Sequence, residues 1–195
     1  MRALLAIVFT VLFSTAAFAH TGVGNTAGFF HGLEHSIGGM DHILAMVAVG
    51  VFAFALGGAA LWLVPLSFVG MMVVGFLLGI GGVDVPFVEM GIALSSVVIG
   101  GAAALGRQMP AAGAMALVGV FAIFHGHAHG AEMPRDAGGL LYASGFVVAT
   151  ALLHLAGISA AFGSAKLAGK YAGPIARIAG GVLALGGVGV LITGL

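Results

Sequence analysis

Two short stretches of the chain concentrate side chains that can bind a metal ion. Residues 30–42 read FHGLEHSIGGMDH and contain three histidines and two carboxylates, and residues 124–132 read FHGHAHGAE. Imidazole and carboxylate together suit Ni²⁺, Co²⁺, Zn²⁺ or Cu²⁺. The chain has no cysteine, which excludes disulfides and thiolate metal sites. We therefore expect a transition-metal site built from histidine and carboxylate side chains.

The first stretch has the spacing of a broken helix. His31 and His35 are four residues apart, so they share one face of a helix. Glycines 38–39 are expected to interrupt that helix, and Asp41 and His42 then open the next one, where an aspartate also suits the helix dipole. Asp41 either binds the ion directly or orients His35 or His42 by a hydrogen bond, without binding the ion itself.

The second stretch places its ligands on one helical face only if it is helical. His125, His129 and Glu132 then fall at positions i, i+4 and i+7. His127 points away in a helix and joins the others only in an extended segment. The alternative interpretation of this stretch is a solvated polar loop that scavenges metal weakly.

Two further ionisable residues lie within apolar segments. His154 follows a long apolar run, and a histidine at membrane depth is costly and usually functional. It is a candidate relay ligand or proton acceptor; the alternative is a neutral histidine bonded to a neighbouring helix. Glu89 lies one turn into another apolar segment, where it lines the pathway or extends to the membrane interface.

The composition is that of an integral membrane protein. Of 195 residues, 61% are hydrophobic and 6% charged, whereas soluble domains carry about 25% charged residues. Six basic residues balance six acidic ones without a basic patch, which argues against a nucleic-acid partner. The lipid bilayer is the expected environment, and the 35 glycines suit closely packed transmembrane helices.

The N-terminus resembles a signal peptide over residues 1–19. Arg2 gives a minimal positive region, residues 3–13 are apolar, and residues 17–19 read AFA, a typical cleavage site. Cleavage would leave His20 at the new N-terminus, where its amine and ring nitrogen can chelate a metal together. The alternatives are an uncut segment that remains as an extra helix, and a His20 that is merely the first loop residue.

Six apolar segments follow, each near the length of about 20 residues that spans a bilayer. They lie at about 39–57, 61–81, 86–105, 110–128, 138–162 and 173–194, and glycines or prolines separate them. No linker is long enough to divide them into two domains. The sequence therefore predicts an all-α fold, a polytopic membrane bundle of about six transmembrane helices, forming a single domain over residues 20–195.

The basic residues predict the orientation in the membrane. With the mature N-terminus outside, four of them fall in or near the cytoplasm and one outside, as the positive-inside rule requires. The four are Arg107, Lys166, Lys170 and Arg177, and the fifth is Arg135. In a bacterial inner membrane, both histidine stretches then face the periplasm, together with Glu89.

At these residues the chain resembles the HupE/UreJ family of small membrane metal permeases. Residues 35–42 match the family pattern His-Pro-x-x-Gly-x-Asp-His, except that Ser36 stands where the family usually has proline. The HGHAHGAE run at 125–132 and the segment 149–154 also look like the family. The resemblance implies uptake of Ni²⁺, or of Co²⁺ in some members, for hydrogenase or urease maturation. It makes the nickel chaperones of that maturation candidate downstream partners.

The leading hypothesis is a transporter that captures a divalent ion at the periplasmic face and moves it inward past His154. The sequence has no phosphate-binding G-x-x-x-x-G-K-[ST] loop, so we expect facilitated or gradient-coupled transport, without ATP and without an organic cofactor. One alternative is a membrane-bound metal sensor or metallochaperone that binds but does not translocate. Another is an intramembrane metalloenzyme, although the chain lacks H-E-x-x-H. The chain as a homo-oligomer is compatible with all three hypotheses.

Overall fold

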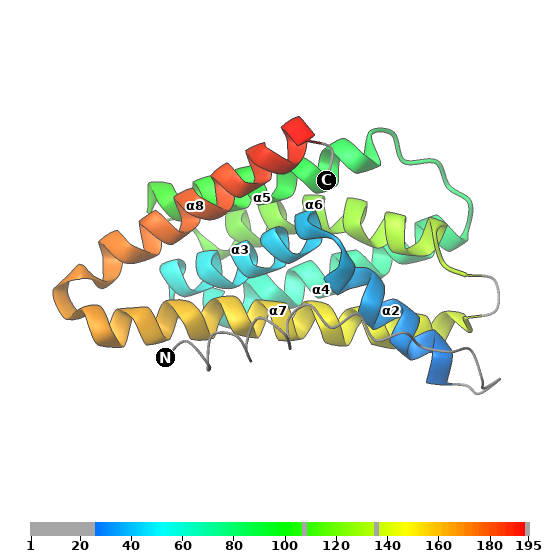
Figure 1. Ribbon diagram of the computed structural model, residues 1–195, viewed down its shortest axis with the longest axis horizontal. Coiled ribbons are helices and arrows are strands. Elements are labelled where there is room, and N and C mark those ends of the chain that lie inside the picture. Colours follow the sequence, from blue (N-terminus) through cyan, green and yellow to red (C-terminus); the bar gives the residue numbers. More distant parts are fainter. Residues whose placement is uncertain (1–25, 107–108, 135–136, 194–195) are drawn as a thin grey trace, which may run out of the picture.

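The computed structural model describes residues 26–106, 109–134 and 137–193, and all regular structure in these ranges is helical (Figure 1). The helices are α2 (Thr26–Gly38), α3 (Met40–Leu56), α4 (Ala60–Ile80), α5 (Val88–Leu105), α6 (Ala111–Ala131), α7 (Gly139–Ala168), the short 3₁₀ helix η1 (Gly169–Tyr171) and α8 (Ala172–Thr193). The predicted signal peptide, His20, Arg107 and Arg135 lie outside the described residues.

The predicted all-helical membrane fold is confirmed. Four continuous stretches are long and apolar enough to cross a membrane, and helices α2 and α3, which meet at an angle of 82°, form a fifth candidate together. The last of the four, Gly139–Thr193, contains both α7, with 30 residues, and α8, with 22. Each of these two helices exceeds the length of about 20 residues that spans a bilayer. The six predicted spans thus correspond to α3, α4, α5, α6, α7 and α8, and α2, which the prediction did not include among the spans, joins α3 in the bent pair.

Helix α3 lies in the middle of the bundle, in contact with α4, α5, α6, α7 and α8 (Figure 1). Its residues are apolar on nearly every side, as expected of a helix surrounded by other helices. Ala45, Val49 and Phe52 are among its buried side chains. His42 also lies on α3 and is buried, so the bundle holds this imidazole within its interior.

Glycines allow helices α4 and α6 to pack with their backbones in contact. A Cβ atom added to Gly126 on α6 would overlap the carbonyl oxygen of Met72 on α4, and one added to Gly75 on α4 would overlap that of Ile123 on α6. Small residues permit such approach in membrane helices. His125, the residue before Gly126, is fully buried and faces Ser95 on α5 (Val88–Leu105).

Candidate metal site

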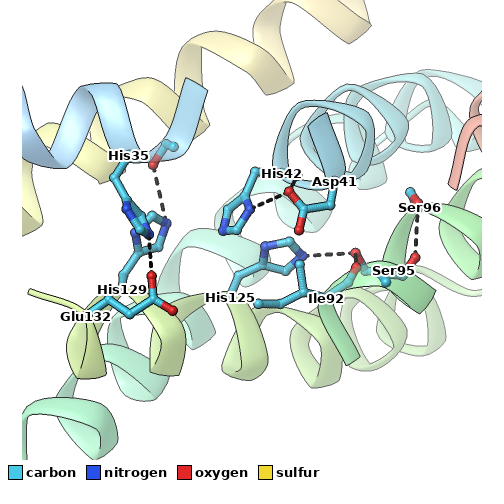
Figure 2. Close-up of polar contacts among 11 residues, drawn as sticks. His35, Asp41, His42, Ile92, Ser95, Ser96, His125, His129 and Glu132 are labelled. Carbon is cyan, nitrogen blue, oxygen red and sulfur yellow. Dashed lines mark hydrogen bonds and ion pairs between the residues drawn. The ribbon is translucent and has the colours of Figure 1, made fainter. Parts of the chain in front are cut away.

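The break between α2 and α3 brings the first histidine stretch against α6. The backbone of Gly39 is extended, with φ −96° and ψ 128°, which ends α2 and lets α3 start in a new direction. A Cβ atom at Gly39 would lie 2.5 Å from the Asp41 carboxylate, so a larger residue there would push this carboxylate away from His42. His35 at the end of α2 and His42 at the start of α3 then both approach α6 (Figure 2).

Asp41 holds His42 by two hydrogen bonds to a single carboxylate oxygen. Asp41 Oδ1 accepts from the backbone N–H of His42 at 2.7 Å and lies 3.0 Å from its ring Nδ1. The backbone N–H is one of the donors that the first turn of a helix leaves unpaired. The carboxylate therefore caps α3 and orients the His42 ring at the same time.

On α6, His125 and His129 are one turn apart, and both side chains are fully buried. The Nε2 atom of His125 lies 2.9 Å from the hydroxyl oxygen of Ser95 on α5. The Nε2 atom of His129 lies 3.3 Å from the hydroxyl oxygen of Ser36 on α2. Contacts with α5 and α2 thus hold the two rings of α6 in place, close to the ring of His42 on α3.

The ring of His42 lies about as close to those of His125 and His129 as imidazoles that share one metal ion. The ring centroid of His42 is 4.7 Å from that of His125 and 5.3 Å from that of His129. With a metal–nitrogen distance of about 2.0–2.1 Å and ligand angles of about 90–110°, ring centroids should lie about 4.5–5.2 Å apart. His35 extends the group, with its ring centroid 4.8 Å from that of His129.

Each of the three buried histidines has one ring nitrogen free of hydrogen bonds. Among the described residues, no partner is found for His42 Nε2, His125 Nδ1 or His129 Nδ1. An unpaired buried nitrogen costs about 1–3 kcal/mol, and a metal ion would satisfy each of them. In the same part of the chain, no group of three or more histidine or acidic side chains would hold a metal ion as it stands. Binding here therefore requires rotation of side chains.

A pocket of about 360 Å³ borders His42, and acidic side chains line it. Asp41, Glu89 and Glu132 all contribute to its wall, along with His35 and His42. Glu132 and Glu89 are exposed, and Glu132 Oε2 lies 3.3 Å from His35 Nε2. The carboxylates give the entrance a negative charge that attracts cations.

Sequence comparison places the chain among known proteins. The profile of the family described as HupE / UreJ protein matches residues 7–190. The chain belongs to the HupE/UreJ family. Protein HupE of Rhizobium leguminosarum bv. viciae is 45% identical to it over 177 residues, which cover 90% of each chain. No solved structure matches the chain. The resemblance that the two histidine stretches indicated is therefore confirmed for nearly the whole length.

In this member of the HupE/UreJ family, the structure brings together most of the predicted ligands. Residues 125–131 are helical, so His125 and His129 share one face. His127 points elsewhere, and its Nε2 lies 2.7 Å from the carbonyl oxygen of Val83. His31 is exposed and does not line the acidic pocket.

His154 is buried on α7, beside Phe68 of α4. It is 2% exposed, and neither of its ring nitrogens has a partner among the described residues. The ring centroid of Phe68 lies 5.6 Å from that of His125 and 5.2 Å from that of His154. His154 is therefore separate from the ring group at the pocket.

Two serines of the site were not predicted to take part. Ser36 was noticed only as a departure from the family pattern, and Ser95 was not singled out. The signal available was weak, because Ser95 is simply a hydroxyl within an apolar segment of 18 residues. Its partner on α6 is 30 residues away in the chain, so only the packing of α5 against α6 reveals the contact.

Proposed function

We propose that the protein is a secondary transporter that takes up a divalent transition metal, Ni²⁺ above the others, across the bacterial inner membrane. The observation that carries this proposal is the set of three unpartnered imidazole nitrogens, on His42, His125 and His129. Beside them, the pocket lined by carboxylates supplies an entrance for a cation. The donor atoms alone suit Co²⁺, Zn²⁺ and Cu²⁺ as well as Ni²⁺. The choice of nickel therefore rests on membership of the HupE/UreJ family.

The ion first meets the carboxylates at the entrance. Glu89 and Glu132 are exposed there, and their negative charges raise the local concentration of a dication. Glu132 also contacts His35, so the ion can pass from an acidic to an imidazole ligand without leaving the pocket. It then exchanges water for the free nitrogens of the buried histidines.

His154 provides the next ligand along the path. Phe146 on α7 stacks on His129 with the ring centroids 4.6 Å apart. His154 follows Phe146 by eight residues on the same helix, which is a rise of about 12 Å. An imidazole with two free nitrogens at that depth suits an ion on its way inward. A sensor or chaperone would not need it.

The distribution of basic residues supports an inward direction from the periplasm. Tyr142 on α7 lies near the pocket, with its ring centroid 6.3 Å from that of His35. Lys166 is 24 residues further along α7, about 36 Å away along the helix axis. Lys170 and Arg177 follow directly on η1 and α8, at the same end as Lys166 (Figure 1). The positive-inside rule assigns that end to the cytoplasm and the histidines to the periplasm.

The membrane potential can drive this uptake. A negative interior favours entry of a cation by about 2.3 kcal/mol per charge for each 100 mV, hence about 4.6 kcal/mol for a dication. We therefore propose uptake without ATP hydrolysis. Neutral imidazoles suit this step, because they bind the ion without adding the negative charge that would trap it.

Uptake of radioactive nickel into sealed proteoliposomes tests the proposal, with zinc, cobalt and copper as competitors. We expect saturable accumulation that is lost in His35→Ala, Asp41→Ala and His42→Ala. Glu34→Gln is the matched control, because Glu34 is an exposed carboxylate beside His35 that does not line the pocket. Binding without accumulation would instead favour a sensor or metallochaperone, and wild-type uptake in all three variants would refute the site.

A further inference from the structure

The hydroxyl group of Ser95 lies inside the bundle, within hydrogen-bonding distance of a backbone carbonyl oxygen and of a histidine ring nitrogen. The side chain is fully buried on α5. Its Oγ lies 2.5 Å from the carbonyl oxygen of Ile92, one turn earlier on the same helix, and 2.9 Å from Nε2 of His125 (Figure 2). A serine in an apolar helix commonly bonds back to its own backbone in this way.

These two contacts decide which atom donates. A carbonyl oxygen carries no hydrogen, so two oxygens at 2.5 Å repel unless the hydroxyl proton lies between them. Ser95 therefore donates to Ile92 and has only lone pairs left for His125. The Nε2 atom of His125 must then carry the ring proton and donate to Ser95. In a neutral imidazole this leaves the lone pair on Nδ1, which is the nitrogen without a partner.

Ser36 repeats the arrangement on α2 with longer contacts. Its hydroxyl lies 3.4 Å from the carbonyl oxygen of Gly32 and 3.3 Å from Nε2 of His129. At these lengths the Ser36 hydroxyl can donate to either partner, so only the Ser95 contacts decide a tautomer on α6. At His42 the carboxylate of Asp41 can only accept, so Nδ1–H of the ring donates to it and the lone pair is on Nε2.

We propose that Ser95 is a positioning residue that fixes the tautomer of His125, so that the ring offers a free Nδ1 lone pair to a divalent metal ion. This inference rests on the proposed function. A metal can only bind a ring nitrogen that carries no proton, and the partner of the other nitrogen determines which one that is. The Ser95 hydroxyl thus prepares the buried ring of His125 for the ion before it arrives.

The test combines a tautomer measurement with a metal titration. Histidine labelled with ¹⁵N reports by its ring-nitrogen chemical shifts which nitrogen of His125 carries the proton in the metal-free protein, and His125→Asn assigns the signal. Titration with Co²⁺, followed by its visible absorption, gives the affinity in detergent. Wild-type protein should show His125 protonated on Nε2. Ser95→Ala should give a mixture of tautomers and a Co²⁺ affinity about 10–100-fold weaker.

Ser96→Ala is the matched control. Ser96 is the next residue on α5, equally buried, and its hydroxyl bonds to the carbonyl oxygen of Ala93 at 3.2 Å. This variant should keep both the wild-type tautomer and the wild-type affinity. Ser95→Thr retains a hydroxyl and should restore the Nε2-protonated form. The restoration separates hydrogen bonding from a loss of packing.

Several results would overturn the inference. They are a wild-type His125 protonated on Nδ1, an unchanged tautomer in Ser95→Ala, an unchanged Co²⁺ affinity in Ser95→Ala, or an equal loss in Ser96→Ala. Failure of the proposed function looks different, because then the wild-type protein itself binds no Co²⁺. In that case the tautomer measurement still decides whether Ser95 fixes His125.

Discussion

Replacing His42 with alanine should remove most of the metal affinity and leave the metal-free fold nearly unchanged. The His42 ring borders the other three imidazoles of the site, with centroid distances of 4.7 Å to His125, 5.3 Å to His129 and 6.1 Å to His35. Loss of a hydrogen-bonding partner of a ligand typically costs 10–100-fold in affinity. Loss of the central ligand itself should cost at least about 100-fold, which equals about 2.8 kcal/mol.

The metal-free protein should tolerate the same substitution. His42 borders the pocket of about 360 Å³, so water can fill the space that its ring leaves. A closed cavity from an aromatic-to-alanine change costs about 3–5 kcal/mol, and this one is open. Removing the ring also removes the unpartnered Nε2, whose burial costs about 1–3 kcal/mol. We therefore expect a loss of stability below about 2 kcal/mol.

Thermal unfolding in detergent, with and without Ni²⁺, measures both effects. At a Ni²⁺ concentration 100 times the wild-type dissociation constant, the metal should stabilise the wild-type protein by about 2.7 kcal/mol. The same concentration should stabilise His42→Ala by only about 0.4 kcal/mol if its affinity is about 100-fold weaker. Equal stabilisation of both proteins by Ni²⁺ would refute the assignment of His42 as a ligand. Unfolding of the metal-free variant would refute the argument from the open pocket.

Four further predictions follow from the same geometry. Glu132→Gln should raise the KM for nickel uptake, since it removes a charge from the pocket entrance, whereas Glu34→Gln, also exposed but outside the pocket, should not; equal effects would contradict a role for the entrance. His154→Ala should still bind Ni²⁺ in detergent but accumulate none in proteoliposomes, and full accumulation would remove His154 from the path. Gly126→Ala should prevent α4 and α6 from packing and lower the yield of folded protein, whereas Gly70→Ala, with open space around it, should not; equal yields in a detergent-extraction assay would contradict the packing argument. Uptake at a clamped membrane potential should fall as the external pH is lowered far enough to protonate the histidines, because protonated imidazoles have no lone pair for the ion, and a flat profile down to the pH at which the protein unfolds would argue against histidine ligands.

Much of the fold could be predicted from hydropathy. Apolar segments near the membrane-spanning length, bounded by glycine or proline, gave the positions of α3 to α8 to within a few residues at most ends. The break at Gly38 and Gly39 was also predictable, because two adjacent glycines interrupt a helix directly before Asp41. The end of α7 was less predictable from the sequence. It continues to Ala168, beyond the predicted limit of 162, since the residues after Phe162 read GSAKLA, in which neither a proline nor a glycine pair stops the helix.

The site was predictable as a set of residues but not as an arrangement. Helical spacing correctly placed His125 and His129 on one buried face and His127 off it. Spacing within one helix carries no information about contacts between helices. The sequence therefore could not show that Ser95 meets His125, that Ser36 meets His129, or that His31 remains exposed one turn before His35.

X-ray absorption at the nickel edge of the Ni²⁺-loaded protein tests the central claim most directly, because it identifies the atoms bound to the metal. We predict several imidazole nitrogens in the first shell of the wild-type protein, with oxygen from carboxylate or water completing it. His42→Ala, loaded to the same occupancy, should show one imidazole fewer. A first shell of oxygen atoms alone, or identical spectra for the two proteins, would contradict the conclusion that the buried histidines of α3 and α6 bind the ion.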